Sequence, residues 1–216
     1  MKKLLNVYTI IGISLLFIFL LLIVILKIDE NVVTENKVGL SSINKKFLPN
    51  KTNDTWNDLT DLLLYFSLVI IFIFVVKGLL ELFNQGSIFK VSPDILVLGV
   101  FVVIMIMVWI GFDKVIIINK RPYANEGSFP STHVLIVTFI SLYSVLYVSR
   151  NDYSKGYTIA LFIISILSIL LTFVGRVKAG EHWFTDSLGG LILGLSFSFL
   201  AYGILKFIDS KKESEA

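Results

Sequence analysis

The hydrophobic residues of this chain fall into six long runs that are separated by short polar stretches. A bilayer core about 30 Å thick is crossed by about 20 apolar residues in a helix, and the six runs are close to that length. Unpaired backbone groups cost several kcal/mol each in hydrocarbon, so segments that cross a membrane in this way must be helices. The predicted spans cover residues 7–26, 62–80, 95–112, 131–148, 157–174 and 187–207.

The composition supports an all-α membrane protein, a six-transmembrane-helix bundle built as one domain over residues 1–216. Of the 216 residues, 56% are hydrophobic and only 16% are charged, against about 25% charged in a typical soluble domain. The net charge of +3 and the scattered lysines favour neither a nucleic-acid binder nor a polybasic tail. The chain has no cysteine, which excludes disulfides and thiolate metal sites.

The first run has two possible roles, because Lys2 and Lys3 precede it as they would precede the apolar core of a signal peptide. The run is too long for that role, and it ends in a charged stretch without a small-residue cleavage site. We therefore expect a retained first span. Residues 28–58, which follow it, are polar and predict an exposed loop with a short amphipathic segment around residues 38–48.

Six spans place both termini on one side of the membrane and the loops after the first, third and fifth spans on the other. Nine of the 19 Lys and Arg residues lie on the terminal side and ten on the opposite side. Three of those ten, Lys114, Arg121 and Arg176, are candidates for a functional role. With these set aside, the positive-inside rule favours cytoplasmic termini.

Three polar patches share the face opposite the termini, and together they contain both histidines of the chain. They comprise Lys114 with Arg121, then Pro130 to His133, then Arg176 with His182 and Asp186. Arginine binds phosphate oxygens bidentately and lysine adds a compact charge. Asp186 is one balancing charge, and Glu181 and Glu126 are possible others; for the remaining positive charge we expect a multiply charged anion.

The second patch adds donors to this predicted anion site. Pro130 and Ser131 start a helix, so the backbone N–H groups of Ser131, Thr132 and His133 are expected to be unpaired. A helix N-terminus with free N–H groups binds phosphate readily.

His182 and Asp186 stand four residues apart, so both side chains lie on one face if a helix begins there. A carboxylate on one ring nitrogen fixes the tautomer and leaves the other nitrogen free to attack, which makes an activated nucleophile. His133 would then be the general acid for the leaving oxygen. A nucleophile, an acid and a cationic clamp are the parts that phosphoryl transfer requires.

Other interpretations of the same residues are weaker. The polar residues could be structural anchors at the membrane surface. His133, His182 and Asp186 could form a two-histidine, one-carboxylate metal site, although three nearby cations would repel a divalent metal. A non-enzymatic lipid-phosphate binder or transporter would need the cations but not an activated imidazole.

The three patches resemble the signature of the type 2 phosphatidic acid phosphatase superfamily, which is Lys-x6-Arg-Pro, then Pro-Ser-Gly-His, then Ser-Arg-x5-His-x3-Asp. The resemblance implies hydrolysis of a phosphate ester or anhydride through a phosphohistidine, without a metal or another cofactor. It implies that His182 is the nucleophile, Asp186 its partner and His133 the acid. The phosphate ligands implied are Lys114, Arg121, Arg176, Ser131 and Thr132.

Two positions depart from that signature, since Thr132 replaces the usual glycine and Gly175 the usual serine. Integral-membrane bacterial members of the family act on phosphatidylglycerophosphate, phosphatidic acid or undecaprenyl pyrophosphate at the outer side of the cytoplasmic membrane. The resemblance therefore implies a lipid phosphate or pyrophosphate substrate, membrane lipids as partners and no nucleic acid. We expect the lipid chains near Trp109, Phe129 and Trp183, where aromatic side chains mark the interface.

Overall fold

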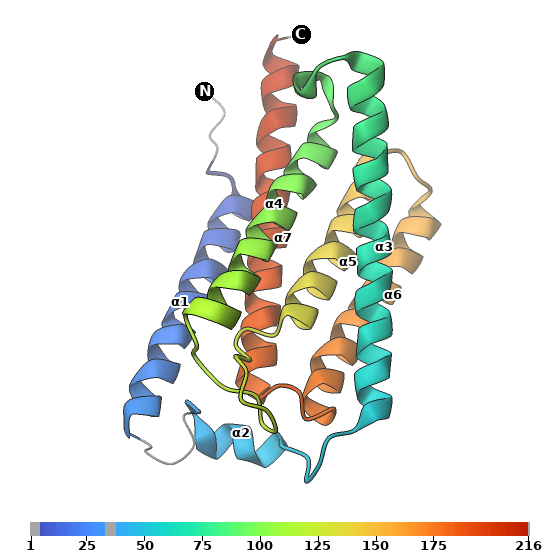
Figure 1. The fold of residues 1–216 in the computed structure, drawn as a ribbon. Coiled ribbons are helices and arrows are strands. Elements are labelled where there is room, and N and C mark those ends of the chain that lie inside the picture. Colours follow the sequence, from blue (N-terminus) through green and yellow to red (C-terminus); the bar gives the residue numbers. More distant parts are fainter. Residues whose placement is uncertain (1–4, 33–37, 216) are drawn as a thin grey trace.

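The computed structural model describes residues 5–32 and 38–215, and within them the chain is a bundle of long helices with no β-strand (Figure 1). Predicted features at residues 1–4, 33–37 and 216 lie outside the described residues. The predicted all-α, six-span architecture is confirmed by six helices that are long and apolar enough to cross a membrane. In chain order the helices are α1 (Val7–Val32), α2 (Ser41–Phe47), α3 (Asp54–Gln85), η1 (Ile88–Lys90), α4 (Pro93–Ile110), η2 (Gly111–Val115), α5 (Thr132–Arg150), α6 (Lys155–Lys178) and α7 (Phe184–Glu215).

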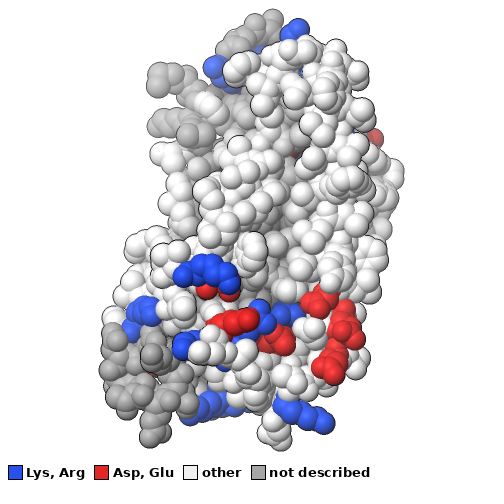
Figure 2. Space-filling model, in the orientation of Figure 1, with Lys and Arg blue, Asp and Glu red and all other residues white. Residues whose placement is uncertain are grey.

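The surface of the bundle matches a membrane-embedded protein. Figure 2 shows a broad middle zone without charged side chains, and the charges on this face gather toward the end that carries α2. The outward faces of the long helices carry exposed Leu, Ile, Val and Phe side chains. The chain is therefore an integral, multi-pass membrane protein.

The first helix is part of the bundle and packs along α7. A Cβ atom on Gly12 would lie only 2.7 Å from Cγ of Leu200, so the two helices touch backbone to side chain at this point. The contact is fixed by two hydrogen bonds: Ser196 Oγ donates to the carbonyl oxygen of Gly12, and Asn6 Nδ2 donates to that of Gly203, both at 2.8 Å.

Small residues also bring α7 against the start of α5. A Cβ atom on Gly190 would lie 2.4 Å from the carbonyl oxygen of Ser131, and one on Gly194 would lie 2.7 Å from Cβ of Thr138. The glycine pair therefore allows the two helices to approach closely. This approach joins the second polar patch to the third.

The two ends of the bundle differ in character. Figure 1 shows the start of α1 and the end of α7 toward one end of the bundle, while α2, the loop before α5 and the α6–α7 connection lie at the other. At the terminal end, Arg150 of α5 holds α4 and α7 together: its Nε lies 2.8 Å from Asp94 Oδ1 and its Nη2 lies 3.1 Å from Asp209 Oδ1. The opposite end carries the polar patches.

Helix α3 is longer than the predicted span of residues 62–80 and begins inside the predicted loop of residues 28–58. The side chain of Asn53 accepts a hydrogen bond from the backbone N–H of Trp56 at 3.2 Å and so caps the helix. The additional turns carry polar residues, and these prove to face the candidate site.

Candidate active site

His182 lies in the short connection between α6 and α7. Gly180 has a positive φ of 75° there, which turns the chain from one helix toward the next. The imidazole is buried, and its Nδ1 atom lies 2.9 Å from the backbone carbonyl oxygen of Ser128. A carbonyl oxygen only accepts hydrogen bonds, so in the neutral ring Nδ1 carries the proton and Nε2 keeps its lone pair.

Asp186 is close to this ring but does not make the short contact. Its Oδ2 atom lies 3.8 Å from His182 Nδ1, which is longer than a hydrogen bond, so the carboxylate acts mainly through its charge. Burial is the largest influence on His182 and lowers its pKa, the Asp186 carboxylate raises it, and the Arg176 charge lowers it. The net lowering favours the neutral ring, which is the nucleophilic form.

The Asp186 carboxylate is fully buried and accepts two short hydrogen bonds. Its Oδ1 accepts from Nδ2 of Asn119 at 2.7 Å, and its Oδ2 accepts from the backbone N–H of Trp183 at 3.0 Å. These donors offset the cost of burying the charge. Asn119 was not among the predicted site residues, and its only signal in the sequence is its position directly after three isoleucines at positions 116–118.

The polar loop before α3 also supports this network. Asn44 of α2 is buried, donates from Nδ2 to Oγ1 of Thr185 at 2.9 Å and accepts at Oδ1 from the Thr185 N–H at 3.1 Å. The N–H of Gly39 donates to Oδ1 of Asn119 at 3.2 Å. The described part of this loop therefore packs against the segment that carries His182 and Asp186.

Arg176, in the last turn of α6, is only 2% exposed and is held by α3. Its Nη1 atom donates to Oδ1 of Asn57 at 2.8 Å and to Oγ1 of Thr60 at 3.3 Å, and it lies 3.4 Å from Oδ1 of Asp61. None of these three α3 residues was predicted to be at the site. The hydrophobic pattern of α3 gives no sign of them, because they precede its apolar run.

Arg121 reaches the same region from the loop before α5. A hydrogen bond of 2.9 Å from its backbone N–H to the carbonyl oxygen of Glu126 closes a tight turn. Its Nη1 atom donates to Oε2 of Glu181, and the same oxygen lies 3.7 Å from Nη2 of Arg176. One carboxylate oxygen therefore bridges the two arginines.

The predicted cationic surplus is wrong for this arrangement. Arg176 faces Asp61 and Glu181, while Arg121 faces Glu181 and lies 3.6 Å from the Glu126 carboxylate. The surplus fails because Asp61 lies on α3, far from the three patches in sequence. Both guanidinium Nε atoms are nevertheless buried without a hydrogen-bond partner among the described residues.

Lys114 lies apart from the two arginines in the structure. It sits in the π-helical turn η2, its side chain is 72% exposed, and its Nζ atom lies 2.6 Å from Oδ2 of Asp113. Asp113 itself, next to it in sequence, faces the cavity beside His182. The structure therefore brings Arg121 and Arg176 together but leaves the Lys114 amine outside that pair.

The start of α5 presents a different set of donors from the one predicted. The Ser131 N–H donates to the backbone carbonyl oxygen of Asp186 at 2.9 Å, so the prediction that this N–H is unpaired is wrong. The Ser131 hydroxyl is buried without a partner among the described residues. Thr132 begins the helix and lines the cavity.

His133, the predicted acid, contacts α3. Its Nε2 atom lies 2.9 Å from Oδ1 of Asp61, the same oxygen that faces Arg176. A carboxylate accepts hydrogen bonds, so Nε2 carries a proton in this pairing. Asp61 therefore joins the predicted acid to a predicted phosphate ligand.

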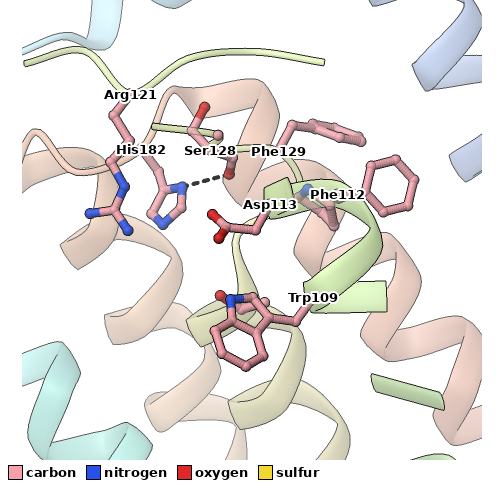
Figure 3. A pocket seen from close by; sticks show the side chains of 10 residues that line it. Trp109, Phe112, Asp113, Arg121, Ser128, Phe129 and His182 are labelled. Carbon is pink, nitrogen blue, oxygen red and sulfur yellow. Dashed lines mark hydrogen bonds between the residues drawn. The ribbon is translucent and has the colours of Figure 1, made fainter. Parts of the chain in front are cut away.

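A small cavity of about 30 Å³ lies beside His182. Figure 3 shows Arg121, His182 and Asp113 directed toward the same space, with Trp109, Phe112 and Phe129 around it. The volume is room for roughly two water molecules, so a phosphate group could enter only if rim side chains move. The lining residues are Trp109, Phe112, Asp113, Arg121, Gly127, Ser128, Phe129, Pro130, Thr132 and His182.

A family model described as the PAP2 superfamily matches residues 60–208, which is more than half of the chain. This protein belongs to the PAP2 superfamily. A search of curated protein sequences finds no match. Family membership supports phosphatase chemistry in a membrane setting.

The fold resembles a crystal structure described as the first transmembrane PAP2-type phosphatidylglycerolphosphate phosphatase from Bacillus subtilis. The TM-score is 0.58 at 21% sequence identity, and the match covers 91% of this chain and 96% of the other. At this identity the comparison establishes a shared fold, over nearly the whole of both proteins.

Close packing explains why this PAP2 protein has glycine at position 175 in place of the serine of the family signature. A Cβ atom there would lie 2.4 Å from Cγ2 of Thr60 and 3.3 Å from Cε3 of Trp56. Helix α3 thus occupies the space that the serine of the family signature would need. The same close approach brings the α3 side chains to Arg176.

The aromatic residues expected near lipid chains divide into two groups. Trp109 is exposed beside the cavity, as expected for a residue at the lipid boundary. Phe129 and Trp183 are buried, and the indole N–H of Trp183 donates to the carbonyl oxygen of Lys120 at 2.6 Å. These two residues shape the site from inside the protein.

Proposed function

We propose that this PAP2 protein hydrolyses a lipid phosphate monoester or pyrophosphate through a phosphohistidine on His182. The observation that supports this most is the short contact between His182 Nδ1 and the Ser128 carbonyl oxygen. It directs the proton to Nδ1 and leaves the lone pair of Nε2 for attack on phosphorus. A site that only binds phosphate has no need of an imidazole held in this way.

In the proposed reaction, Nε2 of His182 forms a bond to phosphorus as the bond to the leaving oxygen breaks. Arg121 and Arg176 hold the phosphate oxygens together with the Ser131 hydroxyl and the start of α5, and Thr132 shapes the space around them. The exposed Lys114 amine reaches the phosphate by a swing of its flexible stem. These cations stabilise the charge that develops in transfer.

His133 gives a proton to the leaving oxygen. The leaving group is the lipid alcohol for a monoester and the lipid monophosphate for a pyrophosphate. A water molecule then attacks the phosphohistidine, and His133 accepts its proton as base. Inorganic phosphate leaves and His182 returns to its neutral form. Asp186 stabilises the positive charge that His182 carries as the phosphohistidine forms.

The substrate classes proposed are undecaprenyl pyrophosphate, phosphatidylglycerophosphate and phosphatidic acid. We place the protein in the cytoplasmic membrane with both termini in the cytoplasm and the active site at the outer side. Six spans and the distribution of Lys and Arg support this orientation. No cofactor is required by the proposed steps.

A phosphate-release assay on purified protein tests the proposal. The panel is undecaprenyl pyrophosphate, phosphatidylglycerophosphate, phosphatidic acid and sphingosine phosphate, each presented with wild type and with His182→Ala. We expect release from at least one lipid and a loss on the order of a thousandfold or more in the variant. Undiminished release by His182→Ala would favour another mechanism, and binding without release would favour a lipid-phosphate binder or transporter.

A further inference from the structure

The Glu181 carboxylate occupies the position between Arg121 and Arg176 that an anion would take. Its Oε2 atom accepts from Nη1 of Arg121 and lies 3.7 Å from Nη2 of Arg176. Arginine binds phosphate and carboxylate oxygens through the same paired N–H donors, so either anion fits this position. Any phosphate held by both arginines must therefore displace Glu181.

The arrangement leaves binding capacity unused. The Nε atoms of Arg121 and Arg176 are buried and have no hydrogen-bond partner among the described residues. A buried donor without a partner is costly. A phosphate group has three oxygens that can accept hydrogen bonds, so it can satisfy donors that a single carboxylate oxygen leaves unpaired.

The Glu181 carboxylate can move away while Arg121 and Arg176 each keep another acidic or polar partner. Its side chain is 26% exposed at the rim, so rotation carries the carboxylate to water. Arg176 keeps Asn57 and Asp61 on its Nη1 atom after Nη2 is released. Arg121 keeps the Glu126 carboxylate 3.6 Å from its Nε atom.

We infer that Glu181 determines specificity by admitting dianionic phosphates and excluding phosphodiesters. This inference rests on the proposed function. The phosphodiester of an ordinary phospholipid carries one negative charge, the same as the carboxylate, so the exchange gains little Coulomb energy. A terminal phosphate carries close to two negative charges at neutral pH because its second pKa is about 6. Exchange with that group is favourable.

This selectivity addresses a problem that any membrane phosphatase faces. Phospholipid headgroups surround the site at high local concentration and would compete for an open pair of arginines. The Glu181 carboxylate has the same charge as a phosphodiester, so a headgroup gains little by displacing it. A dianionic substrate phosphate gains the Coulomb energy of its second charge and can displace it. Removing the Glu181 charge should therefore tighten anion binding and weaken the discrimination between dianionic phosphates and phosphodiesters.

The first measurement is the affinity for inorganic phosphate, by calorimetry on the full chain in dodecyl maltoside. We expect Glu181→Gln to bind phosphate about tenfold more tightly than wild type, since two partly buried ion pairs no longer compete. Glu126→Gln is the matched control, because it removes one charge beside Arg121 without touching Arg176, and its affinity should change less than about twofold. Weaker or unchanged phosphate binding by Glu181→Gln would overturn the inference and make Glu181 a holder of the arginines.

The second measurement is phosphate release from a lipid monoester in micelles with a rising fraction of phosphatidylglycerol. The KM of wild type should stay constant as the diester fraction rises, whereas the KM of Glu181→Gln should rise with it. A lower kcat without diester inhibition would contradict the inference. Glu181→Ala is run beside it, so that one poorly folded variant does not decide the result. If wild type releases no phosphate, the proposed function fails, and the calorimetric comparison still tests Glu181.

Discussion

The Nδ1 atom of His182 lies 2.9 Å from the backbone carbonyl oxygen of Ser128. A backbone group cannot be changed by substitution and does not titrate, so the orientation of this ring depends on the loop before α5. The carboxylate of Asp186, at 3.8 Å, contributes charge rather than direction. Because Ser128 orients the ring and Asp186 supplies charge, substitutions of Asp186 and of His182 should affect catalysis to different extents.

Asp186→Asn should lower kcat by about a hundredfold, clearly less than His182→Ala, because the Ser128 contact persists. The substitution also replaces one of the two carboxylate oxygens, which accept from Asn119 and from Trp183, with an amide NH2 that cannot accept. We expect a loss of about 1–3 kcal/mol in the free energy of unfolding. Thermal unfolding and steady-state kinetics on the two variants check both effects. Equal losses of kcat in the two variants would mean that Asp186 orients the ring after all.

The activity should persist into mildly acidic pH, because burial lowers the pKa of His182 below its ordinary value of about 6.5. The neutral ring is the nucleophile, so kcat/KM should rise with pH through an inflection below that value. Asp186→Asn removes a charge that raises this pKa and should move the inflection further down. A substrate ionisation would not move with the substitution. An inflection above 6.5 in wild type would contradict the assignment.

Restoring the serine of the family signature at position 175 should destabilise the protein. The new Cβ would lie 2.4 Å from Cγ2 of Thr60, and such overpacking typically costs about 1–3 kcal/mol. Thr60→Ser removes that methyl group and keeps the hydroxyl that faces Arg176. Thermal unfolding should therefore show the double variant recovering most of the stability that Gly175→Ser loses. A double variant as unstable as the single one would place the strain elsewhere, for instance at Trp56.

Arg121 should matter more than Lys114 for catalysis. Arg121 lines the cavity, whereas the Lys114 amine is exposed and paired with Asp113. We expect Arg121→Ala to lower kcat/KM by about a hundredfold or more and Lys114→Ala by less than about tenfold. Kinetics on both variants measure this. A larger loss for Lys114→Ala than for Arg121→Ala would contradict this ranking and make the lysine the main phosphate ligand.

The proposed orientation predicts opposite labelling at the two ends of the bundle. The chain has no cysteine, so single cysteines at the exposed positions Asn125 and Lys212 can be tested without background. A membrane-impermeant thiol reagent added to intact cells should label Asn125→Cys and not Lys212→Cys. The reverse pattern would place the site in the cytoplasm.

The sequence was sufficient for the fold because membrane spans leave a strong local signal. Six apolar runs predict six helices, and the solvent permits no other structure for them. The pattern was less informative about helix ends. Helix α3 begins at Asp54, within a predicted loop. The prediction missed its first turns because they are polar and have no hydrophobic period.

The candidate site was predictable only where its residues share a local motif. The four-residue spacing of His182 and Asp186 predicted that the two side chains lie close together. Ser128 orients the ring through its backbone carbonyl group, and such a contact cannot be predicted from the residue type. Asp61 and Asn119 reach the site through tertiary packing of α3 and of the loop before α5. For the same reason the charge balance of the arginines could not be inferred from the three patches alone.

The most direct test of the proposed mechanism is to trap the covalent intermediate in a single turnover. Wild-type protein is mixed with a lipid substrate labelled in its terminal phosphate, quenched in alkali, digested and examined by mass spectrometry. The proposal predicts an acid-labile, alkali-stable phosphoryl group on the peptide that contains His182, and none in His182→Ala. Phosphate release without any phosphorylated histidine, or with the label on His133, would contradict it.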